Sequence, residues 1–153
     1  MLSGCGGTGS TASGTGASAA AAKARFVAQA ARICAGVSTQ EQPLKRREES
    51  LKHLPLAQAD QEFVSLAREA ASIARAADGE LAKLPRPAGD AHTIEGLLRA
   101  YSEEATDATR IADAAANQEN SAGEVASRAL ASSILHNISS AKSYGMKDCF
   151  VLE

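Results

Sequence analysis

Two cysteines, Cys34 and Cys149, most constrain what this chain of 153 residues can fold into, because they enclose nearly all of its patterned region. In the chain-entropy model, a disulfide that closes a loop of this length stabilises a fold by about 4 to 5 kcal/mol. That is comparable to the whole stability of a small domain. We therefore predict a Cys34–Cys149 disulfide, formed in an oxidising compartment. The alternative is two buried free thiols.

Apolar residues recur every three or four positions between these cysteines, which is the spacing of one face of an α-helix. Alternation of the kind that predicts strands is absent from the sequence. The fold class that we predict is therefore an all-α helical bundle. Its four main helices are expected over about 19–36, 56–84, 91–116 and 122–144.

Several residues mark where these helices should begin and end. Pro85 cannot continue the hydrogen-bond ladder of the second helix, so it should stop that helix. Asp90 is a favourable N-cap for the third helix. Ser121 and Glu124 have the spacing of a capping box, and Gly145 is suited to a left-handed helix end.

The predicted disulfide also bears on topology. Cys34 falls near the end of the first helix and Cys149 just beyond the end of the fourth, and these ends are opposite in a plain antiparallel array. A helix of 18 residues is about 27 Å long, whereas bridged Cα atoms lie within about 7 Å. We therefore expect segment 43–54 to form a short returning segment, which adds one traverse. The stapled end would then face away from the start of the first helix.

The first residues have a different composition. Residues 3–18 are almost wholly Gly, Ser, Thr and Ala, which predicts a flexible tether over 1–18 ahead of one helical domain over 19–151. Leu2-Ser3-Gly4-Cys5 matches the bacterial lipobox, so Cys5 is the candidate lipid-attachment site. The alternative is an incidental cysteine in a leader segment.

Charge and composition exclude some classes of partner. The 16 basic and 18 acidic residues are interspersed and give a net charge of −2, so no nucleic-acid partner is expected. No apolar run approaches the roughly 20 residues that cross a bilayer. Contact with a membrane is therefore expected only through a lipid on Cys5.

The sequence shows no constellation typical of catalysis or metal binding. His53, His92 and His136 fall on three segments, and none has a histidine partner one helical turn away. The serines on either side of His136 are not spaced as a preorganised nucleophile and base. We expect no enzyme activity, no catalytic or metal-binding residues and no cofactor.

Three short motifs carry a resemblance. They are Ala30-Ala31-Arg32-Ile33-Cys34, the turn Leu81-Ala82-Lys83-Leu84-Pro85-Arg86-Pro87, and Tyr144-Gly145-Met146-Lys147-Asp148-Cys149. Together they resemble small exported helical lipoproteins of high-GC Gram-positive bacteria. The resemblance covers about 19–149 and implies an exported helical bundle with paired cysteines. Phe150 departs from the small residue that is more usual after the last cysteine.

These features favour a non-enzymatic lipoprotein of the cell envelope, extracytoplasmic and either lipid-anchored or secreted. Its helical surface would act as an interaction module for an envelope protein or a cell-wall component. The alternative is a small-ligand carrier with a groove between helices, lined by Tyr101, Tyr144 and Met146.

Intact mass, measured with and without reductant on protein made with its full upstream sequence, tests both cysteine predictions. We expect a diacylglycerol-sized increase that is lost in Cys5→Ser. We also expect a gain of two hydrogens on reduction that is lost in Cys34→Ser. An unmodified Cys5, or a mass that reduction does not change, would contradict the corresponding prediction.

Overall fold

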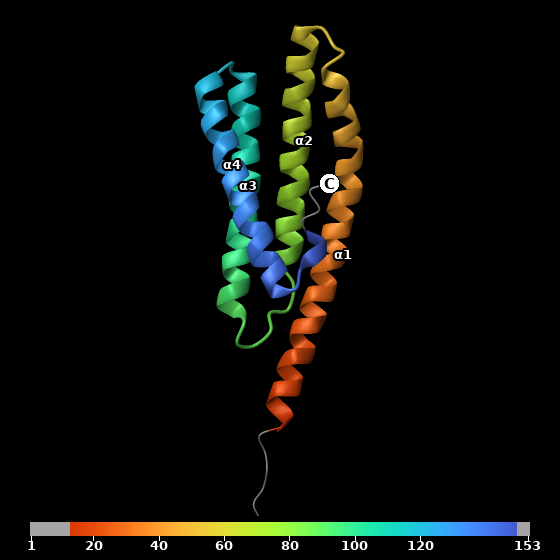
Figure 1. The fold of residues 1–153 in the computed structure, drawn as a ribbon, viewed down its shortest axis with the longest axis vertical. Coiled ribbons are helices and arrows are strands. Elements are labelled where there is room, and N and C mark those ends of the chain that lie inside the picture. Colours follow the sequence, from red (N-terminus) through yellow and green to blue (C-terminus); the bar gives the residue numbers. More distant parts are fainter. Residues whose placement is uncertain (1–12, 150–153) are drawn as a thin grey trace, which may run out of the picture.

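The computed structural model describes residues 13–149, which form four long α-helices and a short final turn (Figure 1). The helices are α1 (Ser13–Leu51), α2 (Leu56–Ala82), α3 (Ala91–Ala116) and α4 (Asn120–Tyr144), followed by the 3-10 turn η1 (Lys147–Cys149). The described part of the chain contains no strand, so the all-α prediction is confirmed. No helix within it is long and apolar enough to cross a bilayer.

The predicted disulfide is present. The sulfur atoms of Cys34 and Cys149 are 2.05 Å apart, and the corresponding Cα atoms are 4.7 Å apart. The bond joins residues separated by 115 positions. It therefore links α1 to the segment that follows α4.

The prediction of a returning segment is wrong, because residues 43–54 do not turn back. α1 continues through Gly36 and Pro43 as one helix of 39 residues. Pro43 removes one backbone donor and crowds the preceding turn. Packing outweighs this penalty, since Leu44, immediately after the proline, is only 7% exposed and lies in an apolar cluster with Leu66 and Ile73 of α2.

The extended α1 also explains why an extra traverse is unnecessary. Cys34 lies in the middle of α1, not at its end. α4 runs antiparallel to α1 and ends beside that midpoint, so four traverses are enough to bring Cys149 to Cys34 (Figure 1). The prediction that the disulfide end of the bundle faces away from the start of α1 is wrong for the same reason. The end of the bundle that lies farthest from Ser13 carries the turns 52–55 and 117–119 (Figure 1).

The first helix begins earlier than expected. α1 starts at Ser13, so residues 13–18 of the predicted tether belong to the helix. The run of alanines that follows them favours helix strongly. Residues 1–12, including Cys5, lie outside the described residues. In Figure 1 the first turns of α1 extend beyond the rest of the bundle.

The start of α3 is tied to the end of α4. Asp90 is the N-cap residue as predicted, but its side chain makes no capping hydrogen bond. Instead, the Tyr144 hydroxyl donates a hydrogen bond to Oδ2 of Asp90, with 2.8 Å between the oxygens. This bond joins residues 54 positions apart and fixes the end of α4 against the turn before α3.

The two ends of α4 test two further predictions. The capping box is wrong, because α4 begins at Asn120, ahead of Ser121, and no side chain caps it. Gly145 ends the helix in the left-handed region with φ of 106°, as predicted, and its N–H bonds to the Ala141 carbonyl. A residue with a Cβ would be strained there.

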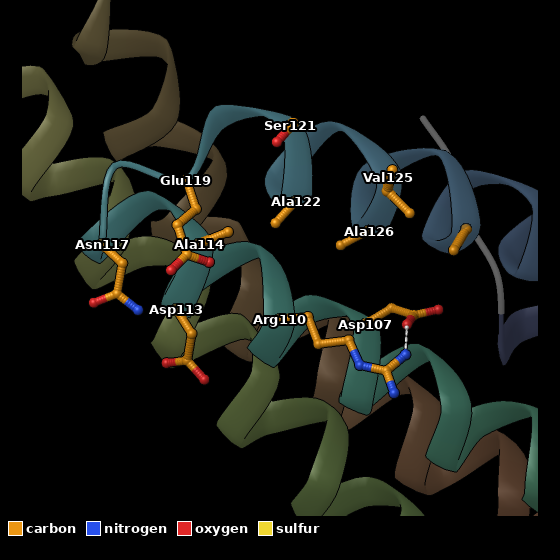
Figure 2. Close-up of a pocket in the computed structure, with 11 residues that line it drawn as sticks. Asp107, Arg110, Asp113, Ala114, Asn117, Glu119, Ser121, Ala122, Val125 and Ala126 are labelled. Atoms are coloured by element: carbon orange, nitrogen blue, oxygen red, sulfur yellow. Dashed lines mark hydrogen bonds and ion pairs between the residues drawn. The ribbon is translucent and has the colours of Figure 1, made fainter.

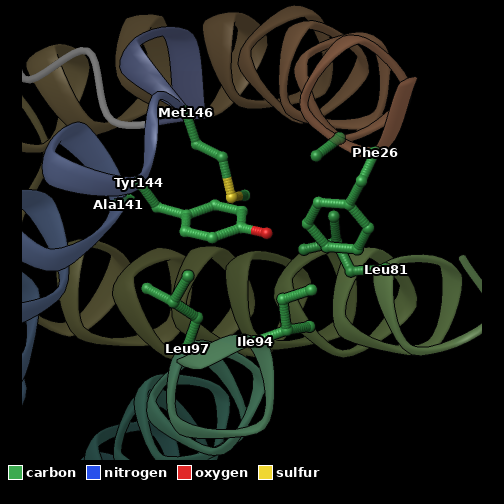
Figure 3. Packing of buried hydrophobic residues seen from close by; sticks show 8 residues of the cluster. Phe26, Leu81, Ile94, Leu97, Ala141, Tyr144 and Met146 are labelled. Atoms are coloured by element: carbon green, nitrogen blue, oxygen red, sulfur yellow. The ribbon is translucent and has the colours of Figure 1, made fainter. Parts of the chain in front are cut away.

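The main core lies where the ends of α2 and α4 meet the start of α3 and the first half of α1 (Figure 3). Within it, the rings of Phe26 and Tyr144 pack edge to face with centroids 6.0 Å apart. The ammonium of Lys23 lies 4.2 Å from the Tyr144 ring centroid. We call this the stapled end, because Cys149 packs against it. Its buried members are Phe26, Ala30, Leu81, Ile94, Leu97, Ala141, Tyr144 and Met146.

The fourth side of the bundle is not closed along its length. Each helix packs on the next one in sequence, but no Cα of α1 lies within 8 Å of a Cα of α4 among the described residues. Between α1 and α2, the Arg47 guanidinium pairs with Glu62 at 2.7 Å and Glu69 at 2.6 Å.

The α1–α2 and α3–α4 pairs diverge toward the turns 52–55 and 117–119, which we call the open end (Figure 1).

We expect the double variant Cys34→Ala/Cys149→Ala to lose about 4 kcal/mol of unfolding free energy, because the unfolded chain regains the entropy of a loop of 115 residues. Urea denaturation followed by circular dichroism measures this loss. Cys5→Ala is the matched control and should leave the midpoint unchanged. A loss below about 1 kcal/mol would contradict the stabilising role of the bridge.

Candidate functional site: a groove between the two helix pairs

An apolar groove of about 430 Å³ lies between the α1–α2 pair and the α3–α4 pair. All four helices contribute to it, because each presents a stripe of residues three or four positions apart. Only Glu48 and Ser127 are polar. We call it the central groove, and its lining is Leu44, Glu48, Phe63, Leu66, Ala67, Ala70, Ala108, Ile111, Ser127, Leu130, Ala131 and Ile134.

The groove is exposed because α1 and α4 do not close over it. Phe63, at an inward position of the helical pattern, remains 40% exposed. Alanines at 67, 70, 108 and 131 add little bulk, so the side chains leave space between the helix pairs. The groove is therefore a consequence of small residues on helices that are held apart.

Further apolar side chains are exposed near the open end. Leu54 and Leu56, in and after the α1–α2 turn, are 37% and 79% exposed, and Val125 near the start of α4 is 63% exposed. Leu54 and Leu56 thus add exposed apolar area at the α1–α2 turn, whereas Val125 lies on a separate groove between α3 and α4. Contiguous exposed apolar area marks an interaction surface.

A smaller cavity of about 180 Å³ adjoins the central groove on the side of the disulfide. Ile134 lines both spaces, so they are neighbours along α4. We call it the inner cavity, and its lining is Cys34, Val37, Ser38, Glu41, Ala74, Ala77, Leu81, Tyr101, Glu104, Ile134 and Cys149.

Two carboxyl groups from different helices face the inner cavity. Burial raises the pKa of the Glu104 carboxyl above its ordinary value, while a hydrogen bond from the Asn137 side-chain amide acts in the opposite direction. Burial also raises the pKa of Glu41, and the charge of Lys45 partly offsets this. Burial, together with the charge of Glu104, raises the pKa of Tyr101. The cavity therefore disfavours negative charge, yet its ionisable groups are acidic.

The charged residues that line the whole site are all acidic. Glu48 lines the central groove, and Glu41 and Glu104 line the inner cavity. No Lys, Arg or His is among the residues that line either space. The site is thus an apolar surface with carboxylates on its α1 side and at its inner end.

A second, more polar groove of about 640 Å³ lies along α3 and α4 near the turn between them (Figure 2). Its buried acid, Asp107, is only 7% exposed and is paired with Arg110 one turn later at 2.9 Å. The rest of its lining comes mainly from short side chains of neighbouring turns, such as Ala122 and Ala126. Its central charge is satisfied internally, so it offers less to a ligand than the central groove.

The structure brings some of the predicted site residues together and separates others. Cys34, Cys149 and Tyr101 line the inner cavity, whereas Tyr144 and Met146 are buried in the core of the stapled end. Across residues 13–149, no three His, Cys, Asp or Glu side chains are grouped so that they could hold a metal ion.

Sequence reasoning missed Glu41 and Glu104. Glu41 lies in the segment between two predicted helices, and Glu104 follows Glu103 on a helix rich in charge, so neither stood out. The signal that could have found Glu41 is its spacing of three from Leu44 and seven from Glu48 on one continuous helix. Glu104 has a similar signal, because it lies three residues after the apolar-face residue Tyr101.

We expect Glu104→Gln to raise the thermal midpoint at about pH 8 and to have little effect near pH 4. The folded state has the raised pKa, so it holds the Glu104 proton at pH values where the unfolded chain has lost it, and stability falls as pH rises through that window. Gln keeps an acceptor for Asn137. Glu95→Gln, on the exposed surface of α3, is the control. A variant midpoint that follows the wild-type pH profile would contradict this account.

Comparison with known proteins leaves the site to be interpreted from its own chemistry. No family model, curated protein or solved structure matches the chain. The resemblance to exported lipoproteins therefore still rests on the three short motifs around Cys34, Pro85 and Cys149.

Proposed function

We propose that this protein is a non-enzymatic lipoprotein of the cell envelope, anchored through Cys5, whose helical domain binds a helical segment of another envelope protein in the central groove. The observation that carries the proposal is that the backbones of α1 and α4 do not approach each other over the apolar groove. An amphipathic helix that lays its apolar face into a groove is a common mode of recognition. Here the added helix would occupy the open fourth side of the bundle.

The dimensions of the site support a helical occupant. From Cys34 to Glu48 the two spaces follow α1 for about 21 Å, which is about four helical turns. A helix of that length would present apolar anchors to Leu44, Ile111 and Ile134 in turn. Residues such as Phe63, which are exposed in the free protein, would then be covered.

The position of the open end supports an envelope role. α1 begins at the opposite end of the bundle from the turns 52–55 and 117–119 (Figure 1). With a lipid on Cys5 and α1 about 58 Å long, the open end would be held away from the membrane surface. A partner in the envelope would then reach the groove without competing with the anchor.

The second candidate is a small-ligand carrier. The volumes of about 430 and 180 Å³ together fall within the range of small-molecule sites, which is roughly 300 to 1,000 Å³. Such sites usually enclose most of the ligand surface. Because the backbones of α1 and α4 stay apart, the site is open on one side, which favours the helical occupant.

We test the proposal with the neutral dye N-phenyl-1-naphthylamine and an uncharged amphipathic helical peptide of Leu, Ala and Gln. We expect the dye to bind in the groove and the peptide to displace it. In Ala131→Trp, where the new ring fills the groove from α4, dye and peptide should each bind about tenfold more weakly. Ser132→Trp, on the exposed face of α4, is the matched control and should bind as the wild type does.

The outcomes separate the candidates. Displacement by the peptide supports helix binding. Dye binding that the peptide does not disturb would favour the small-ligand carrier. Equal dye binding by Ala131→Trp and wild type, or no binding at all, would remove the central groove as the functional site.

A further inference from the structure

The acidic residues of the site form a pattern along one helix. Glu41, Leu44 and Glu48 are three and four residues apart, so α1 presents two carboxylates on either side of an apolar side chain along the groove. Glu41 and Glu48 are seven residues apart, which is about 10 Å along the helix. Glu104, on α3, lines the same inner cavity as Glu41.

Nearby basic side chains are engaged elsewhere or lie off the groove. Arg47 is held by Glu62 and Glu69 of α2. Lys45 is exposed and lies one turn from Glu41, where its charge favours the ionised carboxyl, but it lines neither space. Among residues 13–149, no Lys, Arg or His therefore lines the groove or the inner cavity to meet Glu41, Glu48 and Glu104.

A carboxylate that is partly removed from water is costly unless a cation or hydrogen-bond donor faces it. Glu104 accepts a hydrogen bond from Asn137, but no cation lines the inner cavity. The raised pKa values of Glu41 and Glu104 report this cost in the free protein. A Lys or Arg side chain that entered the inner cavity would supply a charge-assisted hydrogen bond there. The aliphatic stem of such a side chain would also cover apolar surface such as Ile134.

From this arrangement, and resting on the proposed function, we infer that the occupant of the central groove is a basic amphipathic helix of a partner protein. Its apolar stripe lies on Leu44, Ile111 and Leu130, and two Lys or Arg residues about seven positions apart face Glu48 at one end and the Glu41/Glu104 pair at the other. A competing helix with acidic residues at these two positions would be repelled by the carboxylates. The groove would therefore have specificity as well as affinity.

Three peptides test this inference. They share one helical scaffold of Leu and Ala and differ only at two positions, seven residues apart, that carry Lys, Gln or Glu. Fluorescence anisotropy measures their binding at low and at physiological salt. We expect the Lys peptide to bind about tenfold more tightly than the Gln peptide, and the Glu peptide to bind more weakly than either.

The protein variants assign the effect to the named carboxylates. In Glu41→Gln/Glu48→Gln/Glu104→Gln the Lys peptide should bind no more tightly than the Gln peptide binds wild type. The affinity of the Gln peptide should not change. Glu49→Gln, on the exposed side of α1, is the matched control and should preserve the preference for Lys. Circular dichroism verifies that each isosteric variant is folded.

The results distinguish this inference from the proposed function. Equal binding of the Lys and Gln peptides to wild type, or a preference for Lys that survives in the triple variant, overturns the basic partner and leaves groove binding intact. If no peptide binds, the proposed function fails as well. Saturable binding of dodecyltrimethylammonium without peptide binding would reassign the site to a small cationic amphiphile, and a dimer that blocks the groove would reassign it to a second copy. Either result overturns the inference.

Discussion

The rest of the structure depends on the Cys34–Cys149 disulfide and the core beside it, which close the bundle at one end only. α1 and α4 have no backbone contact along their length, so α4 is held by α3, by the buried Tyr144 and by the covalent link beyond it. The bridge reaches the middle of α1, and the second half of α1 lies across the central groove from α4. The central groove is the space that this one-sided closure leaves.

Stability and recognition are thus placed at different ends of the same helices. The stapled end contains the large buried side chains, such as Phe26 and Leu81, and the hydrogen bond from Tyr144 to Asp90. The open end leaves Leu56 and Val125 in water. Apolar area in water costs about 25 cal/mol per Å², and covering it favours binding. Regions of low local stability are where binding surfaces are usually found. The carboxylates of Glu41 and Glu104 add a second cost in the free state, which a basic partner would offset.

Local signals predicted much of this fold, and tertiary packing decided the rest. Pro85, Asp90 and Gly145 act through backbone geometry, so the boundaries of α2, α3 and α4 could be predicted closely. The disulfide followed from the positions of its cysteines. Pro43 misled the prediction, because its penalty is local whereas the burial of Leu44 against α2 is not visible in sequence. The central groove could not be predicted from the sequence, for a related reason. Glu41 and Glu104 are 63 positions apart, and only the path of α1 brings them to one cavity.

Amide hydrogen exchange along α4 in the oxidised protein tests one-sided closure most directly. The opening free energy of residues 136–143, beside the core of the stapled end, should exceed that of residues 124–132, which lie beside the groove. The difference should be largest in the free protein. Equal protection along α4, or stronger protection of residues 124–132, would mean that α1 and α4 pack together in solution and that the groove is closed.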